Sequence, residues 1–530
     1  MKTQVSELAA SAEWGSVSSP QESSFRWSLV LAIAVGILYA ILPTKNYYWD
    51  GISFSQQIEG AGGLNASLFH PNHLIYNHLG YLGWSWLNAL GFHVRALAVL
   101  QAISVVSAAA CICLLHRILC RITRSAYVST TLTLLFALSA HFWRYASDAD
   151  AYVLSLAWLL LAFYFLGRNR ASVVQVGLAH VGAMLVHQLA VWFFPAAMVG
   201  MYRKRGWRGV AGYSAIAIGI TLAAYYAGFV LQTKTSSPRL FLHWVTSHAD
   251  DVTFSFSLGK NLARSAVSYV RLFLGGKTSA VAEFFGPFMI IALIALAAAL
   301  LALVVQLMRY RQDLRLLFSG GPVQPGSADN SRRFEIEAVV WLASYAIFLL
   351  FWLPYNTFYK IFCLPAFIIL ATGWLDRRRV PRHYRLALLV TAMAMGNLAF
   401  SVFPNAHVAA NPAVNIATQL NRLWSNRTVV YYQEQNIDDW YIHYLNPQAI
   451  WKQIPSSDPD TFAQVAAADA AHGREVWLDR SALDALSSHS QGSPLPIDSA
   501  QPYRDVKHVW RGFYRWHVPA AEALRQTQSN

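Results

Sequence analysis

Charged residues are scarce in this chain of 530 amino acids. Asp, Glu, Lys and Arg together make up 13% of the sequence, whereas a soluble domain carries about 25%. Hydrophobic residues reach 55%, mean hydropathy is +0.33, and apolar runs of about 20 residues recur, each long enough to cross a bilayer. This composition excludes an ordinary soluble globular protein and predicts a polytopic α-helical membrane protein.

Cysteine is also rare. The four cysteines, Cys111, Cys113, Cys120 and Cys363, lie in or beside apolar runs, and the segments expected outside the membrane contain none. A disulfide framework is therefore excluded, and no thiol chemistry is indicated. No small-residue cleavage site follows the first apolar run, so we expect this run to remain as a membrane span and not to be a signal peptide.

Basic residues exceed acidic ones by 41 to 27, which gives a net charge of +14. They gather in short segments between apolar runs, where the positive-inside rule assigns them to the cytoplasm, so the lipid bilayer is the expected partner and nucleic acid is not. We expect about eleven spans, near 27–43, 95–116, 126–142, 151–167, 172–186, 188–202, 210–231, 284–307, 335–353, 359–375 and 385–403. The N-terminus is then cytoplasmic and the C-terminus lies outside.

This topology predicts three parts. Residues 1–25 form a cytoplasmic tail, and residues 26–404 form the membrane body. Within the body, residues 44–94 form a first outward loop whose apolar stretch 73–90 reads as an interfacial helix. Residues 405–530 are polar and predict a small α/β domain outside the membrane. Its expected elements are strands at 428–432, 449–451 and 475–478, helices at 437–445 and 458–471, the second capped by Asp458 or Ser457, and a closing hairpin at 503–518.

Acidic residues stand out at the outer membrane face. Asp50 lies in the aromatic segment Tyr47-Tyr48-Trp49-Asp50-Gly51, directly after the first span, and Asp148 and Asp150 precede the fourth span. Burial raises the pKa of a carboxyl group at a membrane edge and makes it a better base. We expect Asp148 to cap the following helix, because acidic side chains are favoured at helix N-termini.

The arrangement of these motifs resembles the GT-C superfamily of membrane glycosyltransferases, in particular its protein O-mannosyltransferase-like branch. The resemblance covers about residues 25–200 and rests on the aromatic-Asp-Gly segment, on His70-Pro71 with Tyr76 and Leu79-Gly80, on Phe142-Trp143-Arg144, on Ala149-Asp150-Ala151-Tyr152, and on His180 with His187. One departure is that the family's usual Glu is replaced by Asp150, which is one methylene shorter.

The resemblance implies a sugar donor carried on polyprenyl phosphate and a hydroxyl acceptor on a glycan, lipid or protein. It also implies location in the bacterial inner membrane, with the tail domain in the periplasm. Inverting transfer needs one base for the acceptor hydroxyl, and Asp50 is the candidate, with Asp150 beside it. The sequence does not identify the sugar or the acceptor.

Further residues are expected to bind substrate. His70, His73 and Tyr76 belong to the first loop, and hydrogen bonding is favoured over metal binding because the histidines lack the His-x-x-x-His spacing of a helical zinc pair. No metal ligands are assigned, and a divalent cation requirement stays open. The remaining substrate-binding candidates are Arg144, Asp148, His187, Arg271, Tyr359 and Lys360. For Lys360 the alternative to phosphate contact is snorkelling to the interface, and for His187 it is a buried structural role.

Two other classes fit part of the pattern. A lipid or sugar transporter would explain the many spans, but it would usually show symmetry between its halves, and the sequence has no internal repeat. An O-antigen ligase or polymerase is also a membrane glycosyl transferase. Its large outward loop normally lies between late spans, whereas the largest exported part here is the C-terminal tail.

Overall fold

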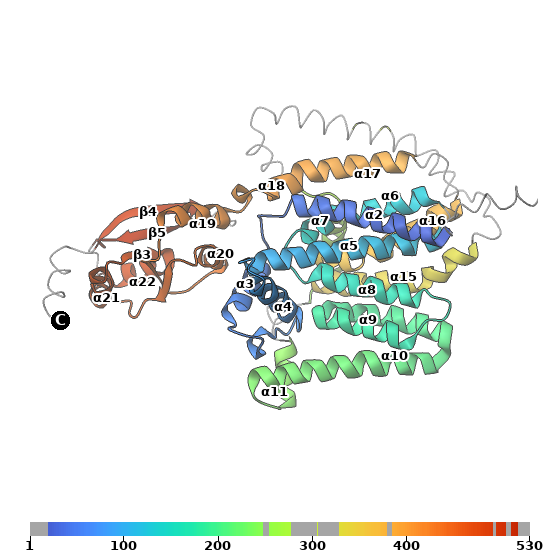
Figure 1. Ribbon diagram of the computed structural model, residues 1–530, viewed down its shortest axis with the longest axis horizontal. Coiled ribbons are helices and arrows are strands. Elements are labelled where there is room, and N and C mark those ends of the chain that lie inside the picture. Colours follow the sequence, from blue (N-terminus) through green and yellow to red (C-terminus); the bar gives the residue numbers. More distant parts are fainter. Residues whose placement is uncertain are drawn as a thin grey trace, which may run out of the picture.

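The computed structural model describes residues 20–123, 125–246, 254–276, 301, 305, 328–378, 384–490, 494–504 and 510–517. The eighth expected span, 284–307, therefore lies almost wholly outside the described residues, as does most of the N-terminal tail. The chain forms a body of packed helices with a smaller sheet-containing domain beyond one end of it (Figure 1). The expected class, a polytopic helical membrane protein with a small C-terminal α/β domain, is confirmed.

The body is built from apolar helices. They are α2 (Pro20–Ile41), α5 (Ala96–Ile122), α6 (Ala126–Ala137), α7 (Ala140–Ala146), α8 (Tyr152–Leu166), α9 (Val173–Val186), α10 (Phe194–Thr233), α15 (Ala328–Trp352), α16 (Leu364–Arg378) and α17 (Tyr384–Asn397). Among the described residues, four helical segments are long and apolar enough to cross a membrane: Ala96–Ile122, Gln188–Thr233, Phe334–Trp352 and Arg385–Asn405. Several others, including α8 and α9, are apolar but shorter.

Helix α10 is interrupted at Gly206, whose φ of +63° and ψ of −162° are not helical. A left-handed φ is accessible to glycine because it lacks a Cβ atom. The interruption falls among Arg203, Lys204, Arg205 and Arg208. It also falls between the two expected spans 188–202 and 210–231, so the basic segment does separate two helical stretches.

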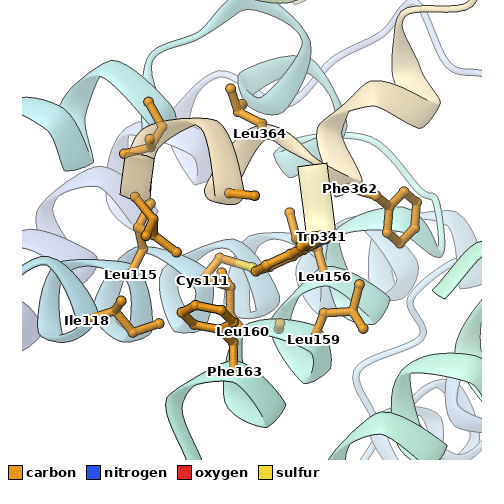
Figure 2. Close-up of a cluster of buried hydrophobic side chains, with 14 of the residues drawn as sticks. Cys111, Leu115, Ile118, Leu156, Leu159, Leu160, Phe163, Trp341, Phe362 and Leu364 are labelled. Atoms are coloured by element: carbon orange, nitrogen blue, oxygen red, sulfur yellow. The ribbon is translucent and has the colours of Figure 1, made fainter. Parts of the chain in front are cut away.

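The centre of the body is a continuous apolar core. Helix α8 is apolar on all sides, which is typical of a buried helix. Figure 2 shows Leu156, Leu160 and Phe163 of α8 gathered with Cys111 and Leu115 of α5, and all of these side chains are fully or almost fully buried. Trp341 of α15 and Leu364 of α16 close the cluster from the other side (Figure 2). This core packs α5, α8, α15 and α16 against one another.

The expected first outward loop, residues 44–94, contains two helices, α3 (Trp49–Gly60) and α4 (Tyr76–Ala89), joined through the short 3-10 helix η1 (Ala66–Leu68). The expected interfacial helix at 73–90 corresponds to α4. Ile52, Phe54 and Ile58 of α3 pack in one buried cluster with Tyr76 of α4 and Leu100 of α5. Beyond α10 follow α11 (Pro238–Thr246), α12 (Leu258–Phe273) and the 3-10 helix η5 (Phe358–Phe362), which precedes α16.

The C-terminal domain contains a five-stranded sheet of order β2-β1-β3-β5-β4. Its strands are β1 (Thr428–Tyr432), β2 (Ile450–Gln453), β3 (Glu475–Asp479), β4 (Ile497–Arg504) and β5 (Trp510–Trp516). The first three are parallel, and β4 and β5 form an antiparallel hairpin. Helices α19 (Pro412–Leu423), α20 (Ile437–Leu445), α21 (Pro459–Ala471) and α22 (Arg480–His489) accompany the sheet.

Most elements of the tail agree with the sequence pattern. The strand at 428–432, the helix at 437–445 and the helix at 459–471 have the expected places, and Asp458 caps the last of these by accepting from the Thr461 N–H. The closing hairpin was expected at 503–518, but its first strand already begins at Ile497. Helix α22 was not expected, because its apolar residues are few.

Candidate active site

Three carboxylates meet at one end of the helical body. Asp50 lies in the first turn of α3, and Asp148 and Asp150 lie in the short connection between α7 and α8. Asp148 and Asp150 are fully buried, whereas Asp50 keeps part of its surface exposed. Asp50 is therefore the member of the three that a substrate can reach.

Close backbone approach brings the two segments together at Gly51. A Cβ atom on Gly51 would lie 2.5 Å from the Ala149 carbonyl oxygen and 2.9 Å from the Ala149 Cβ. Only a residue without a side chain fits this contact. The Asp-Gly pair thus joins a carboxylate with the glycine that allows it to approach Asp148 and Asp150.

Burial and mutual repulsion disfavour ionisation of all three carboxyl groups. Burial, with a smaller contribution from the Asp148 charge, raises the pKa of Asp50 to about 7. Burial also raises the pKa of Asp148 to about 6, against the opposing effect of the Arg144 guanidinium and two backbone N–H groups. Burial and the charges of Asp50 and Asp148 raise the pKa of Asp150 well above its usual range. Near neutral pH, Asp50 is therefore close to its midpoint.

Asp148 holds the start of α3 in place. One carboxylate oxygen accepts from the Tyr48 N–H at 3.0 Å, and the other accepts from the Ala149 N–H at 2.8 Å. The expectation that Asp148 caps the following helix is wrong, because the N-cap of α8 is Ala151 and no side chain caps it. The carboxylate instead joins two segments that are 100 residues apart in the sequence.

Asp150 is the least satisfied of the three carboxyl groups. Neither of its carboxylate oxygens has a hydrogen-bond partner of ordinary geometry, although the N–H groups of Ala151 and Tyr152 lie close enough to favour the charged form slightly. A buried carboxylate with so little hydrogen bonding is costly, so these surroundings disfavour the charged form of Asp150.

Histidine and tyrosine rings form a wall beside the carboxylates. The His187 ring lies 4.6 Å from His73, 5.0 Å from Tyr152 and 5.9 Å from Tyr359, measured between ring centroids. The His70 ring stacks on His73 at 5.4 Å. The structure thus brings these four expected residues together, along with Tyr152, which was not among the substrate-binding candidates.

His187 is held in one tautomer. Its Nδ1 accepts from the Leu189 N–H at 3.0 Å, so that nitrogen carries no proton and Nε2 is the donor. Tyr76 is fully buried and lies edge-on to Phe54 at 5.4 Å. Tyr76 and His187 therefore belong to the packed wall.

Lys360 is fully buried in the contact between η5 and α12. Its Nζ donates to the Ser268 Oγ and to the Pro354 carbonyl oxygen, both at 2.7 Å, and lies 4.8 Å from the centroid of the Tyr269 ring. Snorkelling of this ammonium to the interface is therefore wrong. No ion pair of Lys360 occurs among the described residues, so its charge faces only neutral partners.

Two further cations lie at the junction of α7 and α12. A ring nitrogen of His141 lies 2.8 Å from the Arg271 carbonyl oxygen, and Arg144 follows His141 one turn later on α7. Arg144 is half-buried, and its positive charge is close enough to Asp148 to favour the ionised form of that carboxyl group. Arg271 is exposed and stands outside the buried cluster, so the structure does not bring it to the carboxylates as it does Arg144.

The C-terminal domain contacts this site directly, which the sequence did not indicate. The Tyr441 hydroxyl on α20 donates to the Tyr47 carbonyl oxygen at 2.8 Å, and the Trp440 ring lies 6.2 Å from Trp49. Tyr441 is buried, and the negative charges of Asp148 and Asp50 are close enough to disfavour ionisation of its hydroxyl group. Figure 1 shows α20 beside α3 at the end of the helical body.

A second contact of α20 lies at the far end of α3. The Tyr444 hydroxyl donates to the Glu59 carboxylate at 2.8 Å, and Arg95 binds both Glu59 at 2.9 Å and the Tyr444 carbonyl oxygen at 2.8 Å. Helix α3 is therefore fastened at both of its ends by one helix of the C-terminal domain. Within the part of the chain that the structure describes, no group of three His, Cys, Asp or Glu residues is placed to hold a metal ion.

Comparisons with known proteins agree with this architecture. No protein-family model and no curated protein sequence matches the chain. The crystal structure of ArnT from Cupriavidus metallidurans bound to undecaprenyl phosphate is similar, with 13% identity and a TM-score of 0.57 over 94% of this chain and 98% of that one. The apo structure of the same ArnT gives 14% identity and a TM-score of 0.55 over 93% and 98%. At this identity the likeness concerns the fold.

Proposed function

We propose that this chain, whose fold is that of the GT-C superfamily of membrane glycosyltransferases, transfers a sugar from a polyprenyl-phosphate donor to a hydroxyl acceptor. The observation that carries the proposal is Asp50, a carboxylate that is partly exposed within an otherwise buried acidic cluster. Burial raises its pKa to about 7. A base with a pKa near the working pH gives efficient proton transfer, so the site is suited to deprotonating a hydroxyl group.

The reaction needs one base and one leaving-group site. Asp50 takes the proton of the acceptor hydroxyl while the acceptor oxygen attacks the anomeric carbon. The bond from that carbon to the phosphate oxygen breaks, and the electron pair leaves with the polyprenyl phosphate. Attack from the face opposite the leaving group inverts the anomeric centre. General base catalysis of this kind contributes roughly 10²–10⁴-fold.

Cationic groups support a phosphate-linked donor. The similar ArnT structure holds undecaprenyl phosphate, and this chain places Arg144, Arg271 and Lys360 around η5, α7 and α12. Lys360 is the strongest candidate for the phosphate, because a buried ammonium with only neutral partners gains most from an anion. The His and Tyr wall beside Asp50 supplies hydrogen-bonding groups for the sugar.

The outward position of the site supports an acceptor on the far side of the membrane from the cytoplasm. The excess of basic residues in the opposite loops supports this orientation in a bacterial inner membrane. The C-terminal domain would then lie in the periplasm, where α20 contacts the segment that carries Asp50. The acceptor class is a glycan, lipid or protein that presents a free hydroxyl.

The test compares Asp50→Asn with Asp460→Asn. Asp460 is exposed in the first turn of α21, far from the carboxylates in sequence and structure, so it controls for loss of one negative charge. Both variants are purified from membranes and checked for thermal stability, and cell-surface glycans, lipids and glycoproteins are compared by mass spectrometry. We expect a glycosylated product to disappear in Asp50→Asn and to persist in Asp460→Asn. Identical products in a folded Asp50→Asn protein would refute the assignment, as would transport without a new glycosidic bond.

A further inference from the structure

Helix α12 is amphipathic, but its polar face is the one that packs against the body. The buried residues follow one another at spacings of four, three and four residues and share one face of the helix: Asn261, Ser265, Ser268 and Leu272. Another face is apolar and exposed, with spacings of four residues: Leu258, Leu262, Ala266 and Val270. Val270 alone is 60% exposed. This exposed face is favourable only beside an apolar neighbour.

Hydrogen bonds on the buried face fix the rotation of α12. The side-chain amide of Asn261 donates to the Ser255 carbonyl oxygen at 2.7 Å. The Ser268 hydroxyl donates to the Asn356 carbonyl oxygen at 2.8 Å and accepts from the Lys360 Nζ at 2.7 Å. Turning the helix would leave these buried polar groups without partners, which is costly. The exposure of the apolar face is therefore built into the packing of α12.

A stripe of positive charge runs beside the apolar face. Lys260, Arg264 and Arg271 are exposed, and they lie about one turn and then about two turns apart along the helix. Helix α12 contains no acidic residue. Among the described residues, none of these three side chains has an ion-pair or hydrogen-bond partner. Three cations therefore face outward without a countercharge bound to them.

A partner that satisfies both stripes must offer anionic groups next to hydrocarbon. The chain is a polytopic helical membrane protein. A helix with an apolar face flanked by Lys and Arg is typical of one that lies in the plane of the membrane interface. Its apolar side chains meet the acyl chains, and its cations meet the phosphate groups of anionic lipids. A soluble anion would leave the apolar face exposed to water, and a zwitterionic lipid would attract the cations less.

We propose that α12 lies in the membrane interface and binds anionic phospholipids through Lys260, Arg264 and Arg271. This surface is separate from the candidate contact with the donor phosphate, because Ser268 and Lys360 meet on the buried face of the helix. It therefore does not depend on the proposed transferase function, and it concerns the lipids of the bilayer and not the sugar donor.

The test uses the full chain in phosphatidylcholine vesicles with a trace of spin-labelled phosphatidylglycerol or spin-labelled phosphatidylcholine. Electron paramagnetic resonance measures the fraction of each label that the protein immobilises. The variant is Lys260→Gln/Arg264→Gln, which leaves Arg271 unchanged because Arg271 is also a candidate for the donor phosphate. The matched control, Arg422→Gln/Arg427→Gln, removes two exposed cations from the C-terminal domain. Thermal unfolding checks that each protein is folded.

We expect the parent to immobilise phosphatidylglycerol in preference to phosphatidylcholine. This preference should fall by at least about twofold in the α12 variant and stay unchanged in the control. High salt should weaken it in the parent, because exposed charges are screened. Equal immobilisation of the two labels by the parent overturns the inference, and so does a preference that the α12 variant retains in full. A dimer of the parent that dissociates in the α12 variant, measured by light scattering, would show that a second copy covers this face and would also overturn it.

Discussion

Gly51 and Ala149 touch through their backbones, with the Ala149 carbonyl oxygen 2.5 Å from the position that a Gly51 Cβ atom would occupy. Gly51→Ala must therefore push α3 away from the Asp148–Asp150 segment. Such overpacking typically costs about 1–3 kcal/mol, and we expect transfer to fall at least tenfold because Asp50 moves with the helix.

The matched control is Gly60→Ala, at the other end of the same helix, where a Cβ atom would meet nothing within 4 Å. Alanine is favoured over glycine in a helix, so this variant should be as stable as the parent or slightly more stable. The melting temperature and the turnover rate of the two variants are measured and compared with those of the parent protein. Equal activity in the two variants would show that the close approach does not matter.

The pH dependence of transfer should follow Asp50. Because the base must be ionised, kcat/KM should rise with pH and reach half its plateau near pH 7. Asp148→Asn removes a neighbouring negative charge, lowers the pKa of Asp50, and should move this midpoint to lower pH by roughly one unit. Asp150→Asn should move the midpoint less, because burial and the charges of Asp50 and Asp148 hold the pKa of Asp150 well above its usual range and so disfavour its charged form. If the midpoint of the pH profile is the same in Asp148→Asn as in the parent protein, Asp50 is not the titrating base.

The buried carboxyl group of Asp50 should also lower the free energy of unfolding when it is ionised. Burial raises the pKa of Asp50 in the folded state to about 7, above its unfolded value near 3.9, so the folded protein loses stability as pH rises between these values. Asp50→Asn should therefore raise the free energy of unfolding by roughly 1–4 kcal/mol at pH 8 and by less at pH 5. Thermal unfolding at both pH values measures this. A variant that is less stable at pH 8 would contradict the raised pKa.

Lys360→Met tests the phosphate assignment. Methionine keeps most of the buried volume and removes a charge that has only neutral partners, so the protein should remain folded. Loss of a hydrogen bond to a charged group costs about 1.5–3 kcal/mol, which predicts a KM for the donor raised roughly 10–100-fold. Lys260→Met, on the exposed surface of α12, is the control and should keep the parental KM. A fall in kcat alone would assign Lys360 to another step.

Tyr441→Phe tests the contact between the C-terminal domain and the first loop. The change removes a donor to the Tyr47 carbonyl oxygen and should cost about 1 kcal/mol. Hydrogen exchange should increase in residues 47–60, and activity should fall because α3 is less well held. Tyr432→Phe, in β1, is the control and should change neither. Unaltered exchange in Tyr441→Phe would mean that the other contacts of α20 suffice.

Local patterns in the sequence predicted the helical body, the acidic residues between its spans, and most strands of the tail. The proximity of Asp50 and Asp150 could be predicted, because the expected topology puts both residues on the same side of the membrane and each lies in a short recognisable motif. The contact of Tyr441 with Tyr47 could not, because 394 residues separate them and no local pattern marks either one. For Lys360 the sequence left phosphate contact and snorkelling both open, because burial of its ammonium depends on the packing of α12, which its own segment does not reveal.

The fastening of α3 by α20 has a consequence for the order of synthesis. Tyr47 and Glu59 leave the ribosome early, but their partners Tyr441 and Tyr444 are made nearly 400 residues later. Until the tail has been made and has folded, α3 lacks the contacts that hold it at both ends. A nascent or truncated chain would therefore insert in the membrane with its carboxylates not yet in place, and the finished domain would complete the site.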